Sequence, residues 1–211
     1  QLGYIACVIG AAHHTKKWPV EKWKAFAAQI HHPLILLGGS EDRAAGDTIA
    51  LADPIKVYNA CGKFSLGGSA HLIRNSKLLI SHDTGLMHIA AAFQKPVVCI
   101  WGNTVPAFGF SPWKTPHFNL EVEGLSCRPC SRIGKPACPK GHFFCMNNCN
   151  MVFRYFMFGK ELPDCRLVTD QQKVCRGIMS GQIGFNTLHC FQRGIVATHH
   201  INSYSDHSRL H

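Results

Sequence analysis

The pentapeptide SHDTG, residues 81–85, places polar side chains directly after the apolar run LLI. Asp83 or Thr84 is expected to cap a following helix through a side-chain oxygen, and Gly85 lets a ligand approach the backbone closely. A helix N-terminus binds phosphate through its uncommitted N–H groups and the positive end of the helix dipole. The pentapeptide therefore predicts a diphosphate site, and the alternative is a plain cap before a buried helix.

Two further polar segments follow apolar runs in the same way. The segment GAAHHTKKWP, residues 10–19, contains Lys16 and Lys17, and a lysine neutralises phosphate oxygens as a point charge. The segment LLGGSEDR, residues 36–43, contains Glu41 and Asp42, whose carboxylates could accept hydrogen bonds from ribose hydroxyls. The alternatives are solvated lysines and acidic side chains that only complement a helix dipole.

The elements that must position these segments alternate along the chain. Short apolar runs rich in β-branched residues predict strands over residues 4–9, 33–37, 55–59, 77–81 and 96–101. Periodic or helix-forming stretches predict helices over residues 20–30, 41–52, 69–76 and 85–93. This alternation is typical of an α/β fold with a doubly wound parallel sheet, in which ligands bind outside the carboxyl ends of the strands.

Charge and cysteine divide the 211 residues into unlike parts. Residues 1–126 carry 11 Lys and Arg against 8 Asp and Glu, whereas residues 127–211 carry 11 against 4. Eight of the 11 cysteines also lie after residue 126. We therefore expect a globular α/β unit over 1–126, an irregular Cys-rich segment over 127–150, and a tail over 151–211. The apolar opening without Met suggests a fragment of a longer protein.

The Cys-rich segment offers several candidate metal ligands, which are Cys127, Cys130, Cys138, His142, Cys145 and Cys149. The first two form a C-x2-C pair, the spacing of many structural zinc sites. Reduced thiols and disulfides are the other two interpretations. A zinc-knuckle module that binds nucleic acid is the non-enzyme alternative for the whole chain. That alternative lacks the interleaved aromatic residues that such a module needs, so no nucleic-acid partner is expected.

Four segments together carry a resemblance to a known family. HDTGLMHIAAAFQKPVVCIWGNTVP, GAAHHTKKWP, LLGGSED and CRPCSRIGKPACPKGHFFCM resemble the C-terminal half of a bacterial heptosyltransferase of glycosyltransferase family nine. The resemblance extends from Tyr4 to Met146. It implies the C-terminal, Rossmann-like domain of a GT-B glycosyltransferase, which binds the nucleotide-sugar donor.

The resemblance also implies an activity and a location. The family transfers heptose from ADP-heptose to the lipopolysaccharide inner core, with inversion and without a catalytic metal or other required cofactor. Its acceptor lies at the membrane surface, so the expected location is the cytoplasm, peripheral to the inner membrane. The catalytic base is an acidic residue of the N-terminal domain, which this chain lacks. We therefore expect donor binding without efficient turnover.

The donor-binding residues follow from the matched motifs. Lys16, two positions before Trp18-Pro19, matches a lysine that contacts phosphate, whereas Lys17 does not. Glu41 matches an acidic residue near the nucleoside. The diphosphate is expected against the block of Asp83, Thr84, Gly85, Leu86 and Met87, with His88 close by.

Other interpretations of the globular part and of the tail stay open. A GT-B enzyme that uses a UDP-sugar is the main competitor, because phosphate sites are alike across such donors. A nicotinamide oxidoreductase is disfavoured, since no G-x-G-x-x-G follows a predicted strand. Residues 151–211 lack sustained helix or strand periodicity, and we interpret them as foreign to the family and as an aberrant translation.

Overall fold

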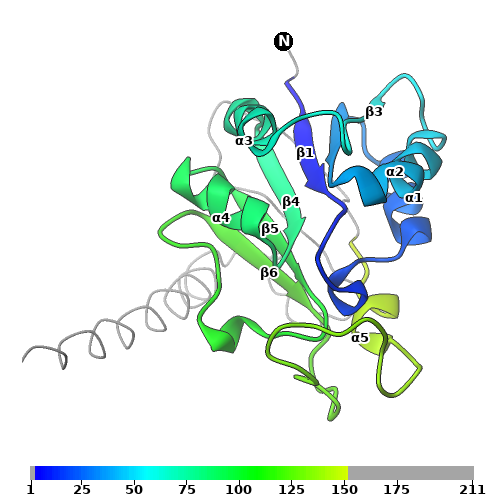
Figure 1. Ribbon diagram of the computed structural model, residues 1–211, viewed down its shortest axis with the longest axis vertical. Coiled ribbons are helices and arrows are strands. Elements are labelled where there is room, and N and C mark those ends of the chain that lie inside the picture. The colour runs from blue at the N-terminus through cyan, green and yellow to red at the C-terminus, as the bar shows by residue number, and fades with distance from the viewer. Residues whose placement is uncertain (1–2, 152–211) are drawn as a thin grey trace, which may run out of the picture.

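The computed structural model describes residues 3–151. These residues form a six-stranded sheet in the order β3-β2-β1-β4-β5-β6, and every neighbouring pair is parallel (Figure 1). The strands are β1 (Ile5–Val8), β2 (Leu34–Leu37), β3 (Val57–Asn59), β4 (Leu78–His82), β5 (Val97–Trp101) and β6 (His117–Glu121).

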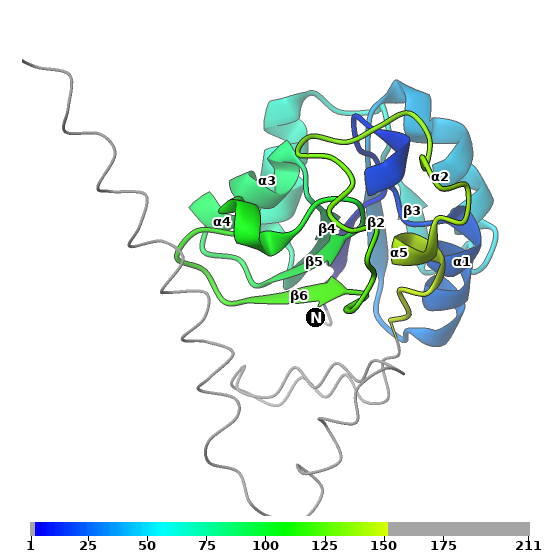
Figure 2. The same ribbon diagram turned by 90° about the horizontal axis from the view of Figure 1, so that it is seen from below.

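Helices cover both faces of the sheet, as Figures 1 and 2 show. The helices α1 (Val20–Gln29) and α2 (Arg43–Ala50) pack on one face, together with the short α5 (Phe144–Asn147). The opposite face carries α3 (Leu66–Asn75) and α4 (Gly85–Ala92). Three single 3-10 turns complete the elements, namely η1 (His14–Lys16), η2 (Ser40–Asp42) and η3 (Pro106–Phe108). The predicted doubly wound α/β fold is confirmed.

Strand alternation divides the core between the two faces. In β1, Ile5 and Cys7 pack toward α1 and α2, while Ala6 and Val8 pack toward α3 and α4. Every residue of β1, β4 and β5 is buried, as expected of central parallel strands that are covered on both faces. This double burial explains why these strands are continuous apolar runs in the sequence.

The predicted elements agree with the structure except at particular places. The helix α3 begins at Leu66, three residues before the predicted start, because Ser65 caps it by accepting a hydrogen bond from the Gly68 amide at 3.2 Å. The sequence did not indicate this start, because Gly67 and Gly68 are poor helix formers. The strand β6 was not predicted, because its sequence HFNLE is polar and mostly half-buried at the sheet edge.

The segment after β6 returns to the rest of the domain. It is irregular apart from α5, as the sequence indicated, and Trp18 donates its indole N–H to the Cys149 carbonyl at 2.9 Å. Within residues 3–151 no helix has the length and apolar character that a membrane crossing requires. Met151 is buried, and the remainder of the predicted tail, residues 152–211, lies outside the described residues.

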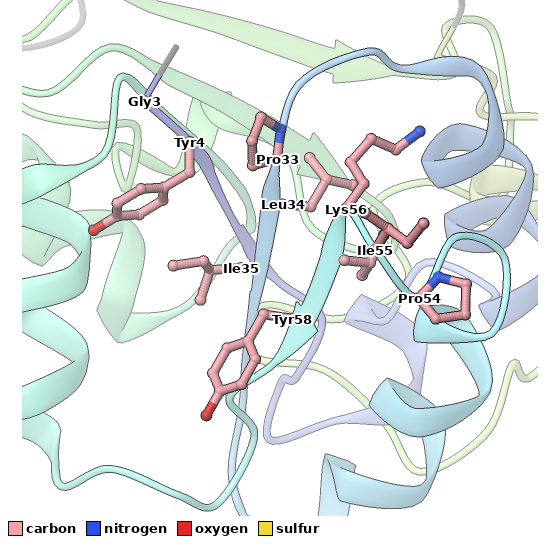
Figure 3. A pocket seen from close by; sticks show the side chains of 10 residues that line it. Gly3, Tyr4, Pro33, Leu34, Ile35, Pro54, Ile55, Lys56 and Tyr58 are labelled. Atoms are coloured by element: carbon pink, nitrogen blue, oxygen red, sulfur yellow. The ribbon is translucent and has the colours of Figure 1, made fainter. Parts of the chain in front are cut away.

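A pocket of about 560 Å³ opens at the amino ends of β1, β2 and β3 (Figure 3). Tyr4, Ile35 and Tyr58 contribute to its lining, and its one lysine, Lys56, is paired with Asp53 at 2.9 Å. The polar segments predicted to bind phosphate follow the carboxyl ends of strands. The pocket therefore lies at the opposite edge of the sheet and is separate from them.

Core packing at β4 leads to a stability prediction. Ile80 is 0% exposed in a central strand, whereas Ile55 is 100% exposed. Ile80→Ala should lower the free energy of unfolding by about 2 to 5 kcal/mol through lost burial and a residual cavity. Ile55→Ala, with the same chemical change, should stay within about 0.5 kcal/mol of the parent. Urea unfolding measures both, and similar losses would contradict the described core.

Candidate functional site

The polar segments meet at the carboxyl edge of the sheet. β1 leads to α1 on one face, while its neighbour β4 leads to α4 on the other. The strand order therefore reverses between β1 and β4, the place where doubly wound sheets bind ligands. Residues 10–19 follow β1 and residues 83–85 follow β4, so both lie at this point. The segment containing Glu41 follows β2, the next strand along.

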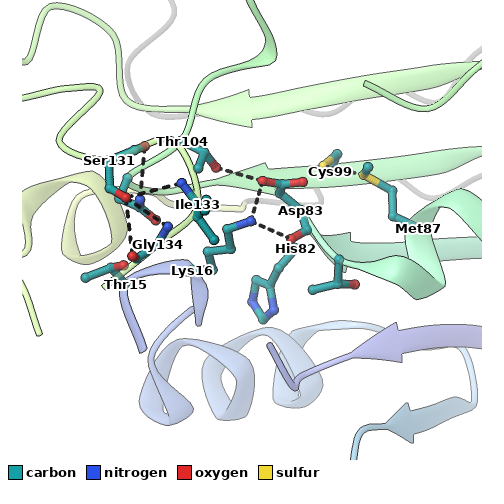
Figure 4. Close-up of polar contacts among 12 residues, drawn as sticks. Thr15, Lys16, His82, Asp83, Met87, Cys99, Thr104, Ser131, Ile133 and Gly134 are labelled. Atoms are coloured by element: carbon teal, nitrogen blue, oxygen red, sulfur yellow. Dashed lines mark hydrogen bonds and ion pairs between the residues drawn. The ribbon is translucent and has the colours of Figure 1, made fainter. Parts of the chain in front are cut away.

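An ion pair joins the first two segments. Lys16 donates from Nζ to Asp83 Oδ2 at 2.7 Å and to the Asp83 carbonyl at 3.3 Å (Figure 4). Thr104, in the turn after β5, donates from Oγ1 to the same carboxylate oxygen at 3.0 Å. The Lys16 and Asp83 side chains are 14% and 11% exposed, so the pair is partly shielded from water. Asp83 thereby fixes the place of the ammonium.

The N-terminus of α4 carries no side-chain cap. Thr84 occupies the N-cap position in an extended conformation, and among residues 3–151 no side chain bonds to the Gly85 or Leu86 amide. The prediction that Asp83 or Thr84 caps α4 is wrong, because the Asp83 carboxylate is engaged by Lys16 and Thr84 Oγ1 lies 3.3 Å from Ser81 Oγ. The Gly85 and Leu86 amides of the first turn, which have no acceptor among residues 3–151, stay available to a ligand.

Gly85 leaves open space at this helix end. Apart from its chain neighbours and its own helix backbone, a Cβ added at Gly85 meets no atom of residues 3–151 within 4 Å, so the exposed backbone faces room for a ligand. Leu86 is half-buried and His88 is exposed on the same turn. Met87 differs, because its side chain is fully buried with Sδ 3.0 Å from Cys99 Sγ, and its amide donates to the Thr84 carbonyl. The Met87 side chain therefore belongs to the core.

The adjacent lysines have different partners. Lys17 donates to Asp42 Oδ1 at 2.7 Å, and Asp42 Oδ2 accepts from the Gly39 amide at 3.0 Å. Asp42 is buried by these contacts, whereas Glu41 is exposed with its carboxylate close to Gly39. Of the two acidic residues, Glu41 is the one accessible to a ligand. Lys16 is directed to the β4 loop and Lys17 to the β2 loop.

Two residues that the sequence did not single out support the site. Arg128, with a side chain 6% exposed, donates to the carbonyls of Gly102, Val122 and Thr104, and to Glu121 Oε2 at 2.7 Å. It thus holds the turn that presents Thr104 to Asp83. Thr104 belongs to the GNTVP turn, which was part of the recognised motif. Arg128 lies in the CRPC segment that also carries the resemblance, but its role could not be predicted there, because tertiary packing brings the Gly102 and Thr104 carbonyls to it.

His82, the last residue of β4, is fully buried and contacts the loop that carries Lys16. Its Nε2 accepts the Trp18 backbone N–H at 2.9 Å, and its Nδ1 lies 3.4 Å from the Gly10 carbonyl. Burial lowers the pKa of His82 to about 4; the charge of Lys17 adds to the shift, while the Gly10 carbonyl and Asp42 oppose it. The imidazole is therefore neutral at pH 7, which leaves Nε2 free to accept.

Comparison with known proteins identifies the family. Residues 1–140 match the family described as "Glycosyltransferase family 9 (heptosyltransferase)". The chain belongs to glycosyltransferase family 9. The match covers the sheet, the Lys16–Asp83 site and the first part of the Cys-rich segment.

Individual relatives agree with this assignment. The family 9 chain is 31% identical over 100 residues to lipooligosaccharide heptosyltransferase 2 of Haemophilus influenzae, covering 44% of this chain and 29% of that protein. It is 29% identical over 139 residues to the Campylobacter jejuni protein of the same description, covering 63% and 42%. The solved structure of Escherichia coli ADP-heptose LPS heptosyltransferase II has a TM-score of 0.54 and 26% identity, over 61% of this chain and 43% of that one. The family 9 chain thus spans less than half the length of these relatives.

Within the residues that the structure describes, the Cys-rich segment of this family 9 chain shows no metal centre. Among residues 3–151, no three His, Cys, Asp or Glu side chains are grouped so that they could hold a metal ion. The candidate zinc ligands are therefore not arranged to hold a metal ion in these residues, although Cys127, Cys130 and Cys138 lie near enough to Cys145 to interact with it electrostatically. The eight cysteines among residues 3–151 are all free thiols. Burial raises the pKa of Cys145 to about 11 and that of Cys149 to about 12, which keeps both protonated at neutral pH.

His82 leads to a prediction about acid stability. Between pH 6.5 and 4 His82 binds a proton in the unfolded chain but not in the folded protein. The free energy of unfolding is therefore at its full value above pH 6.5 and decreases as the pH falls. At pH 4.5 the loss reaches about 2 to 3 kcal/mol. Urea unfolding of the wild type and His82→Gln at pH 7.5 and 4.5 measures it. The variant should lose less stability on acidification, and equal losses would contradict a buried neutral His82.

Proposed function

We propose that this chain is the donor-binding half of an inverting heptosyltransferase, which transfers heptose from ADP-heptose to the lipopolysaccharide inner core. Membership of family 9 supports a glycosyltransferase, and the Escherichia coli relative is described as an ADP-heptose LPS heptosyltransferase. The observation that carries the proposal is the Lys16–Asp83 pair at the uncapped N-terminus of α4, where the strand order reverses. Positive charge and free amides together suit a diphosphate.

The donor diphosphate would bind between Lys16 and the first turn of α4. An ammonium group has three N–H bonds, and in the described part of the chain two acceptors, both on Asp83, contact Lys16. One N–H is thus left for a phosphate oxygen. Because Gly85 has no side chain and faces open space, the diphosphate can approach the helix amides directly.

This arrangement would assist departure of the nucleoside diphosphate. As the bond from the anomeric carbon to the phosphate oxygen breaks, negative charge grows on the leaving ADP. Lys16 and the helix N-terminus are already in place to stabilise that charge, so little reorganisation is needed during the reaction. Asp83 supports this step by holding Lys16 and does not itself contact phosphate, because two anions would repel each other.

The nucleoside and the acceptor would bind on either side of the diphosphate. Glu41, exposed after β2, is the proposed acceptor of hydrogen bonds from the ribose hydroxyls. In a GT-B enzyme the other domain would bind the acceptor sugar and supply the acidic base, and the chain spans only 29% of the Haemophilus influenzae relative and 43% of the Escherichia coli one. We therefore propose donor binding without efficient turnover, at the cytoplasmic side of the inner membrane.

Titration calorimetry with ADP and UDP tests this function. The folded chain should bind ADP more tightly than UDP. Gly85→Val should weaken ADP binding about tenfold or more, because the new side chain fills the open space at the helix amides and a charge-assisted contact is worth about 1.5 to 3 kcal/mol. The matched control is Gly67→Val, also in the first turn of a helix, where a Cβ meets only Ser65 Oγ at 3.9 Å.

The control should leave ADP affinity unchanged. Tighter binding of UDP would favour a UDP-sugar transferase instead. A folded sample that binds neither nucleotide would overturn both alternatives.

The two lysines should contribute unequally to ADP binding. Lys16→Ala removes the ammonium and leaves the Asp83 carboxylate unbalanced beside the diphosphate, so ADP affinity should fall at least about tenfold. Lys17→Ala breaks the pair with buried Asp42 and should lower stability more than affinity. Calorimetric titration and thermal unfolding of both variants separate the effects. Equal losses of affinity would show that only the general positive field matters.

A further inference from the structure

His82 contacts both ends of the loop that carries Lys16. The loop leaves β1 near Gly10, whose carbonyl lies 3.4 Å from His82 Nδ1, and it ends at Trp18, whose N–H donates to His82 Nε2 at 2.9 Å. Lys16 lies in the loop between Gly10 and Trp18. Its ion-pair partner, Asp83, directly follows His82 in the sequence (Figure 4). The single imidazole ring of His82 thus contacts the loop at both its beginning and its end.

The surroundings of His82 fix its orientation and its proton. The side chain is fully buried, and its ring lies edge-on to Trp23 with centroids 5.8 Å apart at 80°. Since Nε2 accepts from an amide, the ring proton belongs on Nδ1, from which it can donate to the Gly10 carbonyl. An apolar side chain in this place would leave both backbone groups without this partner in a buried setting.

The loop has other contacts as well, among them the pair of Lys17 with Asp42 and the bond of the Trp18 indole to the Cys149 carbonyl. Thr15 is bonded to Lys135 of the Cys-rich segment, with the Lys135 N–H 2.8 Å from Thr15 Oγ1. This contact covers the loop, while His82 joins it to β4, the strand that also presents Asp83. Because His82 and Asp83 are consecutive, a displacement of the loop relative to β4 would alter the Lys16–Asp83 distance directly.

We propose that His82 is a positioning residue for diphosphate binding: by joining Gly10 and Trp18 to β4, it places Lys16 against Asp83 and the N-terminus of α4. This inference rests on the proposed function, since it concerns how the same site holds the donor. His82 does not touch the ligand in this role and acts only through Lys16.

A matched pair of amide substitutions tests the inference. The side chain of His82→Gln is long enough to put an acceptor near the Nε2 position, whereas that of His82→Asn reaches only the Nδ1 position. His82→Asn should weaken ADP binding about fivefold to tenfold, within the range of couplings between residues of one network. His82→Gln should retain most of the affinity. Thermal unfolding shows that each sample is folded at the titration temperature.

A double-mutant cycle separates positioning from general destabilisation. In the Lys16→Ala background, His82→Asn should change ADP affinity less than twofold, because the group that His82 positions is gone. Equal losses in the two backgrounds would overturn the inference and leave the proposed function standing. Equal affinities of the Asn and Gln variants would also overturn it.

Hydrogen exchange provides a measurement without ligand. Amides of residues 11–18 should exchange faster in His82→Asn than in His82→Gln, while those of β1 and β5 should be unchanged. Equal exchange rates of the loop amides in the two variants would overturn the inference even if one variant bound nucleotide poorly. A folded wild type that binds neither ADP nor UDP would instead overturn the proposed function, and the positioning role with it.

Discussion

Parallel pairing of β1 with β4 is the constraint on which the candidate site depends. The register Ile5 to Leu78 and Cys7 to Ile80 aligns the carboxyl ends of two strands that are far apart in the sequence. Lys16 and Asp83, separated by 67 positions, can form their ion pair only because these ends meet. The hydrogen bond from the Trp18 backbone N–H to His82 Nε2 depends on the same pairing. Loss of this register would disperse the site without altering any local motif.

The electrostatics of the site follow from how each charge is paired. A carboxylate beside a diphosphate would repel it, yet the charge of Asp83 is balanced by the Lys16 ammonium, and its Oδ2 also accepts a hydrogen bond from Thr104. The pair therefore presents an oriented ammonium whose position is set before a ligand arrives. Asp42 is likewise balanced by Lys17, so the buried carboxylate does not add a free negative charge to the edge.

The Cys-rich segment joins the loops of the site through contacts that involve no thiol group. Arg128 joins it to the turns after β5 and β6, Lys135 joins it to Thr15, and the Cys149 carbonyl accepts from Trp18. It thus contacts the loops on both sides of the Lys16–Asp83 pair. The segment has the C-x2-C spacing of many metal sites, and in the described structure its contacts also hold the loops of the site in place.

The sequence by itself determined the fold class, most element positions and the edge at which the polar segments meet. Those features depend on local periodicity and on the rule that parallel strands end at a common edge. Tertiary structure alone decided which lysine pairs with which carboxylate, that Asp83 does not cap α4, and that Arg128 and His82 support the loops. These contacts join residues up to 72 positions apart, and they depend on the strand order and on the direction of each side chain. Neither is encoded in a local pattern. The edge strand β6 was missed for a different reason, because its polar, mostly half-buried sequence lacks the continuous apolar run of a central strand.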